Sequence, residues 1–78
     1  MPRYFFNLYN DITAIDEDGS DWPDDASAIE NAVESAREVA SANVRSGHLD
    51  LKDYIDVLAA DGRRVGTIVF GDAVTVLT

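Results

Sequence analysis

The sequence predicts an α+β fold with two layers, in which one long helix packs on a small antiparallel or mixed sheet. Between about Asp24 and Ser46, apolar residues recur in steps of three and four, which places them on one face of a helix. The two ends of the chain instead carry short runs of aromatic and β-branched residues, which are typical of strands. The expected order is β-β-α-β-β, and the 78 residues are interpreted as a single domain, residues 1–78.

The chain begins with an expected hairpin. Residues 3–9 read as a strand with aromatic side chains on both faces, so both faces are expected to be at least partly covered. Asn10 and Asp11 are suited to a turn, and residues 12–15 are expected to return as a short second strand.

A polar loop, residues 16–25, leads into the helix and holds six of the 15 acidic residues of the chain. Asp24 is the expected N-cap, with Asp25 and Ser27 as rivals, and Gly47 is the expected residue at which the helix stops. The apolar face is expected to consist of Ala26, Ile29, Val33, Ala36 and Ala40, with Ala32, Val39 and Val44 beside them. A stripe made mostly of Ala and Val lets the helix lie close to the sheet.

After a linker, residues 54–60 and 64–70 read as two strands joined by a turn at Asp61-Gly62. A two-residue loop sets Val57 opposite Gly66. One face of this hairpin is then expected to meet the helix through Ile55, Val57, Ala59, Ile68 and Phe70. The other face holds Tyr54, Asp56, Leu58, Val65, Thr67 and Val69, and a single helix cannot cover both faces. Residues 73–77 alternate weakly and are a candidate for a short C-terminal strand.

The net charge of the chain restricts the kinds of partner that it is expected to bind. Fifteen acidic residues against six basic ones give a net charge of −9, which disfavours a nucleic-acid binder and favours cations or a basic protein surface. The chain has no cysteine, and its N-terminal apolar run is too short for a signal peptide or a membrane helix. We therefore expect a cytoplasmic protein that does not contact membranes.

Three parts of the chain resemble a family of short bacterial proteins, common in alphaproteobacteria and known only as a domain of unknown function. They are the opening MPRYFF, the loop DEDG followed by Pro23-Asp24 and an Ala-rich helix, and the ending VFGDA of the last hairpin. The resemblance covers nearly the whole chain and implies the fold and a bacterial cytosolic setting. It implies no catalytic residues and no substrate. Many members carry a histidine where this chain has Asn7, so any role of that histidine is absent here.

The acidic loop is the best candidate for a metal site. Aligned with a calcium-binding loop, Asp16, Asp18 and Gly19 take the third, fifth and sixth positions, and Asp25 takes the twelfth. The first position is Ala14 rather than a carboxylate, and no helix precedes the loop. A solvated turn is the favoured interpretation, with calcium bound by Asp16, Asp18 and Asp25 as the alternative.

Catalysis is not expected. His48, the single histidine, follows the helix in a linker and reads as a solvent-exposed residue. No motif for a nucleophile or a phosphate loop is present, and a chain with one helix has little room for an enclosed pocket. No cofactor is expected apart from the alternative of calcium.

The favoured hypothesis is a non-enzymatic interaction or regulatory module that forms a homodimer through its second sheet face. Its expected interface residues are Tyr54, Leu58, Val65, Val69 and, as an aromatic that is hard to place in one core, Trp22. The alternatives are a calcium-binding protein and an acidic decoy that docks on a basic protein. The sequence does not identify a protein partner.

Overall fold

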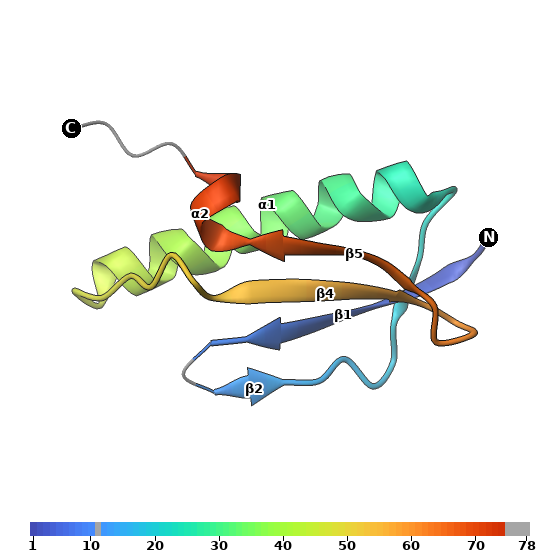
Figure 1. The fold of residues 1–78 in the computed structure, drawn as a ribbon, viewed down its shortest axis with the longest axis horizontal. Coiled ribbons are helices and arrows are strands. Elements are labelled where there is room, and N and C mark those ends of the chain that lie inside the picture. Colours follow the sequence, from blue (N-terminus) through green and yellow to red (C-terminus); the bar gives the residue numbers. More distant parts are fainter. Residues whose placement is uncertain (11, 75–78) are drawn as a thin grey trace.

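The computed structural model describes residues 1–10 and 12–74 and has the predicted α+β architecture (Figure 1). A long helix lies against one face of an antiparallel sheet. The elements in chain order are β1 (Arg3–Tyr9), β2 (Thr13–Ala14), β3 (Ser20–Asp21), α1 (Asp25–Arg45), β4 (Tyr54–Ala59), β5 (Arg64–Val69) and α2 (Phe70–Ala73). The described part measures 40 × 23 × 16 Å, as expected for two layers.

The sheet has the strand order β2-β1-β4-β5, and every pairing is antiparallel. β1 is flanked on both sides and pairs with β4 along nearly its whole length, from Tyr4 opposite Ala59 to Tyr9 opposite Tyr54. On its other side β1 pairs with two short strands, β3 near its start and β2 near its end. β3 falls within residues 16–25, which were predicted to be a polar loop, so that segment contributes one short strand to the sheet.

Both ends of α1 are formed as the sequence predicts. Asp24 is the N-cap, and its Oδ1 accepts a hydrogen bond of 2.8 Å from the backbone N–H of Ser27. Beyond the last helical residue, Gly47 has a φ of +85°, the left-handed conformation that ends many helices. The expected limits of the helix, residues 24–46, are each one residue outside the observed ones.

The core consists of a row of alanines on α1 and the apolar face of the sheet. Ala28, Ala32 and Ala36 are fully buried, and Ala40 is nearly so. On the sheet side they face a set of buried and partly buried residues: Tyr4, Phe6, Leu8, Ile55, Val57 and Ile68. The predicted stripe was wrong at its ends, because Ala26 and Val44 are exposed while Ala28, which was not predicted, is buried. The observed row repeats every four residues, so it follows one ridge of the helix.

The β4–β5 hairpin has the predicted register but a different turn. Val57 lies opposite Gly66 and Ile55 opposite Ile68, as predicted. Near the turn, however, the N–H of Ala59 donates to the carbonyl of Arg63, so the loop has three residues, 60–62, instead of two. A bulge beside Leu58 then restores the predicted register. Because of this bulge, the predicted side of Val65 was wrong. Its side chain packs against the core cluster and does not lie on the second face of the sheet.

Over residues 70–74, the last that the structure describes, the chain does not continue as a strand. Phe70 and Ala73, both buried, belong to the short helix α2, which lies beside α1 (Figure 1). The predicted C-terminal strand at residues 73–77 is therefore wrong at Ala73 and Val74, and residues 75–77 lie outside the described part. The predicted turn at residues 10–11 includes Asp11, which also lies outside it. Within the described residues, no helix has both the length and the apolar character needed to cross a membrane.

Candidate interaction surface

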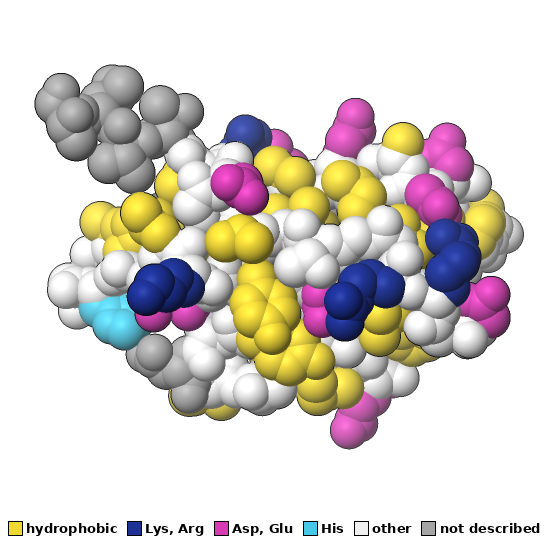
Figure 2. All heavy atoms as spheres, in the orientation of Figure 1, with side chains coloured by type: hydrophobic (Ala, Val, Ile, Leu, Met, Phe, Trp, Pro, Cys, Tyr) yellow, Lys and Arg dark blue, Asp and Glu magenta, His cyan; other side chains and the backbone are white. Residues whose placement is uncertain are grey.

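The face of the sheet that points away from α1 is the open face, and its side chains form three rows across the strands. The strand register places them in these rows: Tyr9, Tyr54 and Val69; Asn7, Asp56 and Thr67; Phe5, Leu58 and Arg64. No described helix lies over this face, and Figure 2 shows hydrophobic side chains gathered in a band across the middle of the molecule. Its apolar members are only half-buried. Apolar surface that remains partly exposed on a sheet is typical of a docking face.

The first row is built around two stacked tyrosines. The rings of Tyr9 and Tyr54 lie with their centres 4.9 Å apart and their planes at 22°. Because the two residues are direct partners on β1 and β4, the stack is fixed by the sheet itself. Tyrosines held in this way lose little conformational entropy on binding, which is one reason why they are favoured at interfaces.

The middle row is polar and is satisfied by contacts within the sheet. The hydroxyl of Thr67 donates to Oδ1 of Asp56 at 2.5 Å, and Oδ2 of Asp56 lies 3.8 Å from a guanidinium nitrogen of Arg64. Asn7 is buried, and its Oδ1 accepts a hydrogen bond of 3.0 Å from the backbone N–H of Asp16. Among the described residues of the three rows, Asp56 is therefore the one carboxylate, and it is paired with a neighbouring arginine.

The structure brings together three of the five predicted interface residues. Tyr54, Leu58 and Val69 lie on the open face. Val65 does not, because the bulge directs it to the core, and Trp22 lies beside α1, where it also packs against the core cluster. The prediction missed Phe5 as a partner of Leu58. Only the pairing of β1 with β4 reveals that neighbour, and strand order cannot be read from the spacing of apolar residues.

The acidic loop uses its first carboxylate to close the edge of β1. Oδ2 of Asp16 accepts from the backbone N–H of Phe6 at 3.1 Å, and Oδ1 accepts from the N–H of Gly19 at 2.9 Å. This carboxylate thus occupies the edge of β1 between the places where β2 and β3 pair with it. Asp18 is exposed, and its backbone carbonyl accepts from Arg3 at 3.0 Å.

The third candidate calcium ligand, Asp25, is engaged elsewhere. Its Oδ1 accepts a hydrogen bond of 2.7 Å from the hydroxyl of Tyr4, and its Oδ2 lies 3.4 Å from Nη1 of Arg63. Among the described residues, no group of three or more carboxylate, imidazole or thiol side chains is placed to hold a metal ion. Calcium binding by Asp16, Asp18 and Asp25 stays a prediction, and two of the three carboxylates already have partners within the fold.

The contact of Asp25 with Tyr4 and Arg63 ties the start of α1 to β1 and to the hairpin tip. The hydrogen bond from Tyr4 and then that from Arg63 hold the pKa of Asp25 below its usual value of 3.8. The same hydrogen bond to Asp25, together with burial, raises the pKa of Tyr4 above 10.0. Both directions show that the charged form of Asp25 and the neutral form of Tyr4 belong to the folded state.

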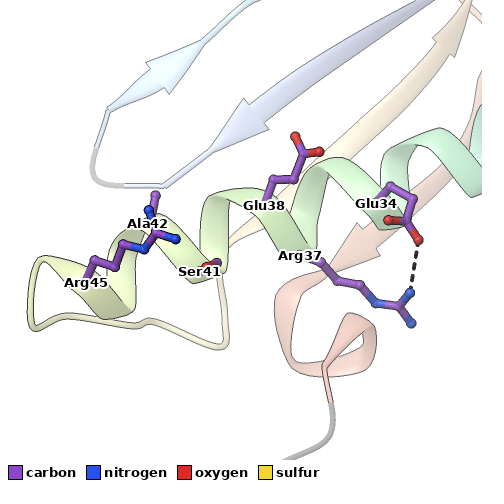
Figure 3. Close-up of a pocket in the computed structure, with 6 residues that line it drawn as sticks. All are labelled: Glu34, Arg37, Glu38, Ser41, Ala42 and Arg45. Carbon is purple, nitrogen blue, oxygen red and sulfur yellow. Dashed lines mark hydrogen bonds and ion pairs between the residues drawn. The ribbon is translucent and has the colours of Figure 1, made fainter.

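The outer side of α1 carries a shallow depression of about 370 Å³, lined by Glu34, Arg37, Glu38, Ser41, Ala42 and Arg45 (Figure 3). Its side chains project outward from the helix and do not converge on one point. The guanidinium of Arg37 donates two hydrogen bonds, one to the carboxylate of Glu34 at 3.2 Å and one to the carbonyl of Ala73 at 2.8 Å. Exposed pairs of this kind contribute little and define no binding site.

Comparison with known proteins matches the chain to a protein family. The family described as "Domain of unknown function (DUF6894)" matches residues 3–71, which is most of the chain. No curated protein and no solved structure matched the sequence.

Proposed function

Since the chain belongs to the DUF6894 family of domains of unknown function, we propose a role from its surface: a non-enzymatic interaction module that self-associates through its open face. Two copies pack these faces together in this proposal. The rows of Phe5 and Leu58 and of Tyr9, Tyr54 and Val69 supply the apolar contact.

The observation that carries the proposal is the half-buried apolar band on a sheet whose described helices leave one side uncovered. A chain of 78 residues buries only about 60% of the surface that its unfolded form exposes. A second layer on the open face covers the stacked tyrosines and Leu58, and so adds core that one copy lacks.

Charge selects a second copy as the occupant. At a net charge of −9, two copies repel each other over most of their surfaces. The open face is the exception, because the one carboxylate in its described rows, Asp56, is buried and lies beside Arg64. Two such faces can approach without placing unpaired carboxylates against each other. A mostly neutral face of this kind also provides no electrostatic attraction for a strongly basic partner.

The test is the oligomeric state of a variant with a charge in the apolar row. We expect wild type to form dimers and Leu58→Asp to weaken the dimer by about thirtyfold or more, since a desolvated carboxylate replaces an apolar contact on both copies. Sedimentation equilibrium over a range of protein concentrations measures this change. A wild type that remains a monomer at the highest concentration contradicts the proposal.

Two further variants separate loss of the interface from loss of the fold. Ile12→Asp makes the same kind of change at a residue that is 77% exposed and outside the open face, and should leave dimerisation unchanged. Thr67→Lys places a cation next to Asp56 on the exposed centre of the face, where it can be paired within the monomer. It should retain the folded circular-dichroism spectrum and still weaken the dimer. If both Leu58→Asp and Thr67→Lys dimerise like wild type, another surface is responsible.

A further inference from the structure

A second surface, separate from the open face, lies where the segment that precedes α1 meets the first half of that helix. Trp22 and Pro23 lie along the first half of α1 and form one wall of an open groove of about 380 Å³. The helix supplies the rest of the lining, Ser27, Glu30, Asn31 and Glu34, whose spacing puts them on one face of α1. None of the residues that line this groove belongs to the open face.

The indole of Trp22 is a fixed wall. Its Nε1–H donates to the hydroxyl of Ser20 at 2.9 Å, and its backbone N–H donates to the carbonyl of Pro2 at 3.0 Å. The ring also packs against the core cluster, yet the residue remains partly exposed. The loss of conformational entropy that comes with ordering this side chain therefore occurs mostly on folding, and little of it remains to oppose binding.

The charges that line the groove are negative. Glu30 is exposed and has no hydrogen bond or ion pair among the contacts of the described residues. The carboxylate of Glu34 forms an ion pair with the guanidinium of Arg37 at 3.2 Å. Both side chains of this pair are more than half exposed. No lysine or arginine is among the lining residues.

We propose that this groove binds a lysine or arginine side chain presented by a basic protein. An aromatic face attracts a cation through its quadrupole. The carboxylate of Glu30 lines the same groove and would balance the positive charge of the bound side chain. The net charge of −9 adds long-range steering towards a basic surface. Charge complementarity thus favours this occupant over a second copy of the chain, which is itself acidic.

The fluorescence of Trp22 tests the proposal directly, because it is the single tryptophan of the chain. The probe is a short oligolysine peptide, titrated at low salt, with a peptide of the same length and acetylated lysines as the neutral control. We expect the oligolysine peptide to change the intensity or wavelength of the emission with a saturable curve, and the acetylated peptide to leave it unchanged. Calorimetry with the same peptides measures binding independently of the fluorophore.

Matched variants locate the site. Glu30→Gln should raise the dissociation constant of oligolysine by roughly threefold or more, since one carboxylate contact is lost. Glu38→Gln removes the same charge from the same helix (Figure 3), at a residue that does not line the groove, and should change binding much less. Arg37→Gln frees the carboxylate of Glu34 and should strengthen binding more than Arg45→Gln, which also removes one positive charge but lies two turns further along.

Several results overturn the proposal. If Glu38→Gln weakens binding as much as Glu30→Gln, the attraction is a general effect of net charge. If calorimetry detects binding while the Trp22 emission stays constant, the peptide binds elsewhere. If the acetylated peptide binds equally well, or if neither peptide binds, the groove is not a cation receptor. An emission that changes with protein concentration alone, without peptide, in Leu58→Asp as well as in wild type, identifies a second copy as the occupant.

Discussion

Gly19 combines a left-handed backbone with a tightly packed environment. Its φ is +70°, and a Cβ atom added there would lie 2.8 Å from the carbonyl oxygen of Tyr4 and 2.9 Å from the ring of Phe5. The N–H of the same residue donates to Asp16, so the turn that seals the edge of β1 depends on this backbone shape. Asp16 and Gly19 of the sequence DEDG are therefore explained by an edge closure.

We expect Gly19→Ala to lower the free energy of unfolding by about 2 kcal/mol or more, because backbone strain adds to a steric clash. Gly47→Ala is the matched control. Gly47 has a similar φ of +85°, but nothing lies within 4 Å of its added Cβ. Its cost should be about 1 kcal/mol, the strain alone. Urea denaturation of both variants measures the difference, and equal losses would show that the packing around Gly19 is not tight.

Asp25 gives the folded state a dependence on acid pH. Because its folded pKa lies below the usual 3.8, its contribution is present above that value and is lost as the pH falls through the folded pKa. Asp24 acts in the same direction, since hydrogen bonds from Ser27 lower its pKa. Asp25→Asn keeps an oxygen that can accept from Tyr4 but cannot titrate. We expect the melting temperature of this variant to fall less steeply than that of wild type below about pH 4.

The exposed residue Glu17 provides the control for this pH series. Glu17→Gln removes a carboxylate that has no hydrogen bond or ion pair among the described contacts, so its acid profile should follow that of wild type. Parallel profiles for wild type and Asp25→Asn would contradict the assigned hydrogen bonds to Tyr4 and Arg63.

At the scale of elements, the sequence predicted what local patterns determine. The cap at Asp24, the stop at Gly47 and the register that sets Val57 opposite Gly66 all depend on residues close together in the chain. The buried stripe of α1 was predicted less well, since Ala26 and Ala28 have the same polarity and only contact with the sheet distinguishes them. The bulge beside Leu58 was also unpredictable, because a two-residue and a three-residue loop fit the same Asp61-Gly62 signal.

Helix α1 contacts the sheet through a row of alanines, so the two layers lie close together. Ala36 is fully buried, so Ala36→Leu forces extra volume between the two layers. We expect this variant to be destabilised by about 1–3 kcal/mol, since overpacking moves the helix off the sheet. Ala42→Leu makes the same change on the exposed side of the same helix and should alter stability by less than about 0.5 kcal/mol. Thermal or urea unfolding compares the pair, and an unaffected Ala36→Leu would mean that the two layers are not in close contact.

For the molecule as a whole, the candidate surfaces could be predicted only in part. The surplus of apolar residues on the second face of the hairpin pointed to Tyr54, Leu58 and Val69, because alternation along a strand fixes its two faces. The groove could not be found in this way. Trp22 is brought beside Glu30 by the path of the loop that precedes α1, and no local pattern encodes that path.

The two proposed surfaces respond to salt in opposite directions. Dimerisation through the open face brings together two copies that each carry −9, so added salt should screen their repulsion and strengthen the dimer. Binding of a basic peptide at Trp22 is an attraction between opposite charges, and the same salt should weaken it. Sedimentation of the protein alone and fluorescence titration with oligolysine, each repeated at low and moderate salt, measure both trends on one sample. A dimer that weakens with salt would mean that ion pairs rather than the apolar rows hold it, and peptide binding that is indifferent to salt would exclude the carboxylate of Glu30 as its partner.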